Sequence, residues 1–131
     1  MRAVARRVND GLKHHIDIGT HKVTSDEPRD IGGSDAGPNP QELLAASLAS
    51  CSAITLEMYA RRKGWDVGDV VVDVDYEPAQ RGSPTRFEIK VHLPKELPED
   101  QRERLMQIVA KCPVHRTLEG EVMFEERLEL I

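Results

Sequence analysis

Apolar and polar positions alternate over two short segments near the start of the chain, residues 3–8 and 12–18. The turn sequence NDG (residues 9–11) separates them, and these residue types favour the positive φ values of tight hairpin turns. Residues 21–24 can add a third short strand. We therefore predict a small antiparallel sheet, followed by a loop over residues 25–39 that is rich in proline, glycine and acidic residues.

A long helix is predicted over Pro40–Lys63. Asn39 suits the N-cap, Pro40 suits the first helical position, and Gly64 ends the segment. Residues 43–58 are apolar or small on every side, which a surface helix does not need. We expect a helix of about 36 Å, buried on all faces. Because one small chain cannot readily cover such a helix, the pattern also favours a homodimer.

Two alternating segments later in the chain are predicted to pair as a hairpin around the turn at residues 82–84. Their inward-facing residues are Val70, Val72, Val74 and Tyr76 in one segment and Phe87, Ile89, Val91 and Leu93 in the other.

A second helix is predicted over residues 97–111, with Pro98 at its start and Pro113 ending or kinking it. Its apolar stripe consists of Leu105, Ile108, Val109 and Cys112. Residues 121–131 are expected to form a last strand, with Val122, Phe124, Leu128 and Leu130 on one face. The predicted fold is α+β: strongly curved antiparallel β-sheets wrap around a long central helix, in a single domain over residues 1–131.

The composition excludes several classes of function. The chain has 131 residues, 39% hydrophobic and 31% charged, and a net charge of −5, which disfavours binding to nucleic acid. We expect no membrane span, because no apolar stretch approaches about 20 residues. We expect a cytoplasmic protein whose two cysteines are reduced.

Cys51 and Cys112 are the candidate chemical groups. Each can be read as a small core residue, because free cysteine is among the most buried residue types. Cys51 lies in a run of small residues that leaves room for a substrate, whereas Cys112 is predicted at a helix C-terminus, where the helix dipole disfavours a thiolate. If both are functional, Cys51 is the better attacking thiol and Cys112 the better resolving partner.

A metal site is not expected. Cys112 and His115 have a usable spacing, and His14, His15 and His21 lie in the first strands, but a zinc site normally needs three or four ligands with a recognisable second pair. No hydrolase, nucleotide-binding or zinc-protease motif is present either, and no cofactor is expected.

The segment GPNPQELLAASLASC (residues 37–51), together with KCPVH (residues 111–115), resembles the OsmC/Ohr family of osmotically induced and organic hydroperoxide resistance proteins, most closely its OsmC-like branch. The resemblance implies an intertwined homodimer that reduces peroxides by a two-cysteine cycle. It implies that Cys51 attacks the peroxide, that Cys112 resolves the sulfenic acid, and that an external dithiol reduces the disulfide.

Two departures from this pattern concern the environment of the attacking thiol. Glu42 matches the glutamate that the family's helix start usually retains, but Gln41 occupies the position where hydroperoxide reductases carry a glutamate that holds an arginine. That arginine comes from the first hairpin turn of those enzymes. Here Arg7, Arg29 and Arg116 are the alternatives, and the sequence does not choose among them.

Both thiols can still be purely structural core residues. Two functional hypotheses stay open beside that interpretation. The first is a thiol-dependent hydroperoxide reductase that prefers organic peroxides. The second is an OsmC-like redox-sensing or small-ligand-binding protein without efficient turnover.

Overall fold

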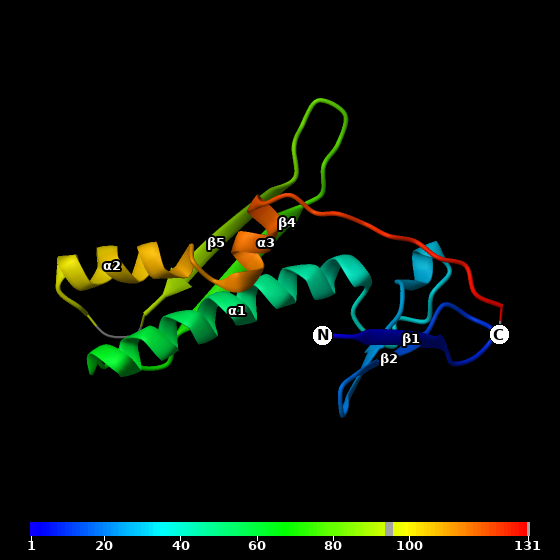
Figure 1. The fold of residues 1–131 in the computed structure, drawn as a ribbon, viewed down its shortest axis with the longest axis horizontal. Helices are drawn as coiled ribbons and strands as arrows, with labels where there is room; N and C mark the ends of the chain where they lie inside the picture. The colour runs from blue at the N-terminus through cyan, green and yellow to red at the C-terminus, as the bar shows by residue number, and fades with distance from the viewer. Residues whose placement is uncertain (94–95, 131) are drawn as a thin grey trace. The chain divides into compact units, whose positions relative to one another are not determined.

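The computed structural model describes residues 1–93 and 96–130 of the chain (Figure 1). The chain forms two compact units, Met1–Ala46 and the remainder from Ser47 onward, with the boundary inside a long helix. The predicted α+β class, with antiparallel sheets and one long helix, is confirmed. The single domain over residues 1–131 and the homodimer stay predictions.

The N-terminal unit contains the three predicted strands: β1 (Ala3–Arg7), β2 (His14–Ile18) and β3 (His21–Ser25). They pair antiparallel in the order β1-β2-β3. The first turn is longer than the NDG sequence alone, because the Val8 N–H donates to the Lys13 carbonyl and residues 8–13 all lie outside the strands.

The loop after β3 is organised by a buried carboxylate. Asp26 is 2% exposed, and its oxygens accept hydrogen bonds from the backbone N–H groups of Glu27, Ser34 and Ala36. Gly33 is required in this loop because a Cβ there would lie 1.8 Å from the Glu27 carbonyl oxygen. A short 3₁₀ turn, η1 (Arg29–Ile31), lies within the loop.

Helix α1 (Pro40–Lys63) has the predicted bounds. A capping box fixes its start: the Asn39 side chain accepts from the Glu42 N–H at 2.8 Å, and the Glu42 carboxylate accepts from the Asn39 N–H at 3.0 Å. Gly64 ends it with φ of 71°.

The expectation that α1 is buried on all faces is wrong for the single chain. Its buried residues lie along one side: Leu48, Ser52, Leu56, Tyr59 and Ala60. Ile54 and Met58 on another side are 56% and 59% exposed. When small and apolar residues surround a helix on all sides, the sequence therefore does not show which of its faces are buried within the single chain.

The core of the second unit lies between α1, a β-hairpin and a second helix (Figure 1). Strands β4 (Val71–Glu77) and β5 (Arg86–His92) form the predicted hairpin, and α2 (Glu99–Val109) is the predicted second helix in shorter form. The buried core residues are Leu56, Tyr59, Ala60, Val67, Leu105, Ile108 and Val109.

The end of the chain differs from the prediction. A further helix, α3 (Pro113–Glu119), begins at Pro113, the residue that was predicted to end or kink the preceding helix. The C-terminal segment (residues 121–130) contains no strand in the single chain (Figure 1). Its apolar side chains are exposed, including Phe124 at 79%. Residue 131, the end of the predicted strand, lies outside the described residues. A strand needs a partner to pair with, and this segment pairs with none of the residues that the structure describes.

Helix α1 also corrects the expectation that no segment is long and apolar enough to cross a membrane. Its 24 residues contain a window with a mean hydropathy of 1.4, and it is the one such helix in the described part of the chain. The core helix of a globular protein passes the same test, and Leu48 and Leu56 of α1 are fully buried by protein. Length and composition alone therefore do not assign α1 to a membrane.

Candidate functional site

Cys51 lies in the middle of α1, half-buried, at an open pocket of about 380 Å³ in the second unit. The pocket combines hydroxyl groups with apolar side chains: Ser47, Ser50, Cys51, Ile54, Thr55, Met58, Pro113 and Val114. Most of these residues come from one face of α1, and the last two come from the start of α3. A small amphipathic molecule can therefore reach the Cys51 sulfur from solvent.

Cys112 is fully buried and is the N-cap of α3. Its sulfur accepts hydrogen bonds from the His115 N–H at 3.2 Å and from the Ser52 hydroxyl at 4.0 Å. The predicted helix C-terminus is therefore wrong as a description of this residue: α2 ends at Val109, and Cys112 begins the next helix. The helix dipole at this position favours a thiolate instead of opposing it.

The two cysteines are free thiols, and Cys51 lies close enough to Cys112 to raise its pKa. Burial raises the pKa of Cys112, and the Cys51 thiol raises it further, because two neighbouring sulfurs resist becoming charged together. The hydrogen bonds from the His115 N–H and the Ser52 hydroxyl lower this pKa, but burial outweighs them. Cys112 thus favours the protonated form more than an ordinary cysteine does.

Glu42 and Gln41, the two expected supporting residues, are both exposed. The Glu42 carboxylate is engaged in the capping box of α1, so it has a structural role. Gln41 precedes Cys51 by ten residues on the same helix, which corresponds to about 15 Å along the axis. An arginine would have to bridge that distance for residue 41 to act on the sulfur.

None of the described residues that line the Cys51 pocket is an arginine. Arg7 donates to the carbonyls of Asp10 and Gly11 in its own hairpin turn. Arg29 begins η1, also in the N-terminal unit, and Arg116 is an exposed residue of α3. The choice among the three therefore stays open.

The histidines do not gather around the cysteines. The His14 ring hydrogen-bonds the Leu12 carbonyl, and the His115 ring faces the Glu119 carboxylate one helical turn away, without the alignment of a hydrogen bond. Within residues 1–93 and 96–130, no group of three or more His, Cys, Asp or Glu side chains is arranged to hold a metal ion.

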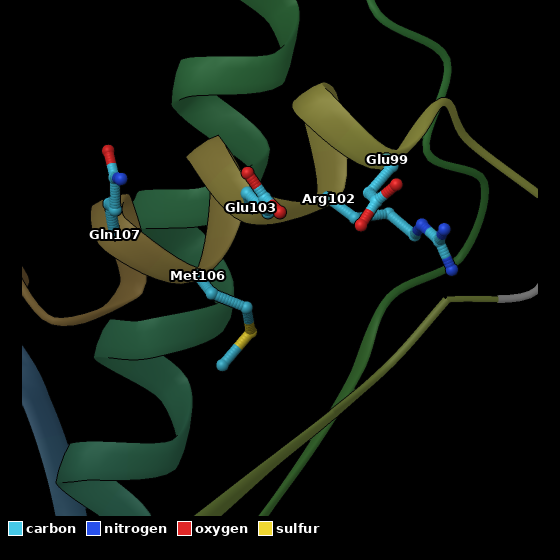
Figure 2. Close-up of a pocket in the computed structure, with 5 residues that line it drawn as sticks. All are labelled: Glu99, Arg102, Glu103, Met106 and Gln107. Atoms are coloured by element: carbon cyan, nitrogen blue, oxygen red, sulfur yellow. The ribbon is translucent and has the colours of Figure 1, made fainter.

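A larger hollow of about 560 Å³ lies along α2 (Figure 2). Its described lining comes from this helix alone: Glu99, Arg102, Glu103, Met106 and Gln107. Figure 2 shows these side chains projecting from the helix without converging on one point. The described lining of the hollow along α2 contains no thiol or other strong nucleophile. The Cys51 pocket is therefore the better candidate for chemistry.

Sequence reasoning identified both cysteines but missed the two groups that hold Cys112. Ser52 belongs to the run of small residues around Cys51, which does not show that its hydroxyl meets Cys112, and the backbone N–H of His115 has no side-chain signal. The pair Cys112-Pro113 carried a usable signal, because proline is favoured at the first position of a helix and the preceding residue is then its N-cap.

Comparison with known proteins shows the fold and the family of this chain. A curated relative in Haloferax volcanii, itself uncharacterized, is 27% identical over 90 residues, which cover 67% of this chain and 68% of that protein. Two solved structures share the fold. An OsmC-like protein from Mycoplasma pneumoniae has a TM-score of 0.70 at 21% identity, covering 91% of this chain and 86% of that one. The organic hydroperoxide resistance protein OhrB of Bacillus subtilis has a TM-score of 0.60 at 21% identity, covering 91% and 90%.

The family assignment rests on a match to a family model that covers more than half of the chain. The family model described as "OsmC-like protein" matches residues 32–127, a span that includes both cysteines and all of α1. This chain therefore belongs to the OsmC-like protein family.

Proposed function

We propose that this protein is a thiol-dependent peroxidase that reduces organic hydroperoxides in oxidative stress defence, with Cys51 as the attacking thiol and Cys112 as the resolving thiol. One observation carries the proposal: a half-buried cysteine lines an open pocket and interacts with a fully buried second cysteine. The partly apolar lining, with Ile54 and Met58, suits the alkyl part of an organic peroxide.

The roles of the two thiols follow from access to solvent. Cys51 can meet a peroxide in its pocket, whereas Cys112 is fully buried and has a raised pKa. Access to solvent, and not a helix C-terminus at Cys112, is therefore the reason for assigning the attack to Cys51.

The proposed cycle has three steps. The Cys51 thiolate attacks the terminal peroxide oxygen, the O–O bond breaks, and the alkoxide takes a proton to leave as an alcohol, which leaves Cys51 as a sulfenic acid. The Cys112 thiolate then attacks the sulfenic sulfur; the S–O bond breaks, and the departing hydroxide takes up the proton that Cys112 released. An external dithiol supplies two electrons and reduces the resulting disulfide.

The working form is proposed to be a homodimer in the cytoplasm. The exposed side of α1 and the apolar residues of the C-terminal segment (residues 121–130) give a second copy an apolar surface to cover. The resemblance to the OsmC/Ohr family supports the same assembly.

Peroxide consumption with a dithiol reductant tests the function directly. Cys51→Ser is expected to abolish consumption, whereas Cys112→Ser should still form a sulfenic acid that dimedone traps at Cys51. Dimedone labelling of Cys112 in the Cys51→Ser protein, without labelling of Cys51 in the Cys112→Ser protein, would reverse the two roles.

The second candidate is a redox-sensing or small-ligand-binding protein without efficient turnover. Two observations favour it: no arginine is among the described residues lining the pocket, and Gln41 replaces the glutamate that orients an arginine in the hydroperoxide reductases. Single oxidation of Cys51 without repeated turnover in excess dithiol would support this candidate over the peroxidase.

A further inference from the structure

Ser52 is a buried polar residue that the proposed cycle does not use. It follows Cys51 directly on α1 and is fully buried. Its hydroxyl donates to the Cys112 sulfur at 4.0 Å, across 60 positions of sequence. Of the serines near Cys51, Ser50 instead donates to the Ser47 carbonyl of its own helix.

We propose that Ser52 is a positioning residue for the disulfide-forming step: with the His115 N–H, its hydroxyl holds the Cys112 sulfur in the orientation from which it meets Cys51. This role rests on the proposed function for its place in the cycle. Consecutive residues of a helix point about 100° apart, so Cys51 and Ser52 approach the same sulfur from different directions. One supplies the reaction partner and the other a hydrogen bond.

The hydrogen bond matters most when Cys112 loses its proton. A hydroxyl that donates to a thiolate forms a charge-assisted bond, which is stronger than its bond to a neutral thiol. Ser52 therefore favours the form of Cys112 that attacks the sulfenic sulfur. The step itself is unchanged: a sulfur–sulfur bond forms, the S–O bond of the sulfenic acid breaks, and water leaves.

The surroundings of Cys112 allow this effect to be isolated. The one titratable group among the described residues that acts on its sulfur is the Cys51 thiol; the other contributions are burial, the His115 N–H and the Ser52 hydroxyl. The His115 ring is directed to Glu119 instead. In a Cys51→Ser background, the titration of Cys112 therefore reports on the hydrogen bonds.

The first experiment measures the pKa of Cys112 in that background by the ultraviolet absorbance of its thiolate. Ser52→Ala removes the donor and is expected to raise the pKa, whereas Ser52→Thr retains the hydroxyl and restores it. Thr117→Ala is the matched control, because it removes a hydroxyl from α3 that donates only to the Pro113 carbonyl. An unchanged pKa in Ser52→Ala would overturn the proposal.

The second experiment follows the disulfide-forming step without any peroxide. The chromogenic aryl disulfide dithiobisnitrobenzoate first reacts with Cys51 and releases one coloured thiol. Cys112 then attacks the Cys51 sulfur of the mixed disulfide, whose S–S bond breaks to release the second coloured thiol. Ser52→Ala is expected to slow the second release by roughly three- to tenfold, the effect of one hydrogen bond, and to leave the first unchanged.

The two experiments separate this proposal from the proposed function. If peroxides fail to oxidise Cys51 while Ser52→Ala still slows the second release, the peroxidase assignment fails and the role of Ser52 stands. If Ser52→Ala leaves the second release at the wild-type rate, or slows both releases equally, the positioning role is wrong whatever the peroxidase assay shows.

Discussion

The Asp26 carboxylate accepts a hydrogen bond from the Ala36 N–H at 3.1 Å and thereby closes the loop between β3 and α1. Burial raises the pKa of this carboxyl, but the N–H donors of Glu27, Ala36 and Ser34, with the charge of Lys13, outweigh burial and hold the pKa below its ordinary value of 3.8. The ionised form is therefore the one that the loop binds.

The protein is expected to lose stability in acid through this residue. Because its folded-state pKa is lowered, the contribution of Asp26 is fully present above pH 3.8 and is lost as the pH falls through the folded-state pKa. Asp26→Asn should lower the thermal midpoint at neutral pH, and the difference from wild type should shrink in acid. Asp30→Asn, an exposed change in the same loop, is the control. A difference that stays constant from neutral pH into acid would contradict this account.

Truncation of the central core residue of α1 is expected to be costly. Leu56 is fully buried in the core cluster that also contains Val67 and apolar residues of α2. Leu56→Ala should therefore reduce the free energy of unfolding by about 2–5 kcal/mol. Met106→Ala, on the half-exposed side of α2, should change it by less than about 0.5 kcal/mol. Denaturant unfolding of both variants measures the contrast, and equal losses would mean that the core is misplaced.

If an arginine lies within reach of residue 41, Gln41→Glu is expected to speed the oxidation of Cys51. A carboxylate can form a charge-assisted, two-pronged bond to an arginine, whereas the amide of Gln41 offers one carbonyl acceptor. Single-turnover oxidation by a bulky organic hydroperoxide measures the effect. Glu42→Gln is the control, because Glu42 caps α1 and its loss should reduce stability without changing this rate. A fast wild-type rate that Gln41→Glu leaves unchanged would show that the thiolate needs no carboxylate there.

The apolar C-terminal segment provides a test of the dimer. Phe124 is 79% exposed in the single chain, so Phe124→Asp should be harmless to a monomer but should weaken a dimer that buries this side chain. Sedimentation equilibrium at micromolar concentration should show a dimer for wild type and dissociation for the variant. Thr85→Asp, which adds the same charge at an exposed position, is the control. A stable wild-type monomer would refute the assembly itself.

The sequence predicted those elements whose ends carry distinctive residues. Asn39, Pro40 and Gly64 mark both ends of α1, and strict alternation marks β4 and β5. The C-terminal strand was wrong for the single chain because strand formation depends on a pairing partner, which a local pattern does not contain. The sequence also did not show which face of α1 is buried, because this depends on the elements that pack against the helix.

The candidate site could be predicted only in part. The resemblance identified Cys51 and Cys112, and the structure brings their thiols close together. The hydrogen bonds that hold Cys112 come from a backbone N–H and from a serine 60 positions away, and neither leaves a recognisable spacing in the sequence. Tertiary packing alone brings them together.

The sulfur of Cys112 also completes the first turn of α3, and this ties a backbone amide to the state of the thiol. A disulfide would draw the Cys112 sulfur to a covalent distance of about 2 Å from the Cys51 sulfur, so oxidation would shift this acceptor away from the His115 N–H and weaken the N-cap. The His115 amide proton should then exchange with solvent faster in the oxidised protein than in the reduced protein. The exchange rate of this one amide proton would thus report whether the two cysteines are oxidised or reduced, without any reagent that reacts with sulfur.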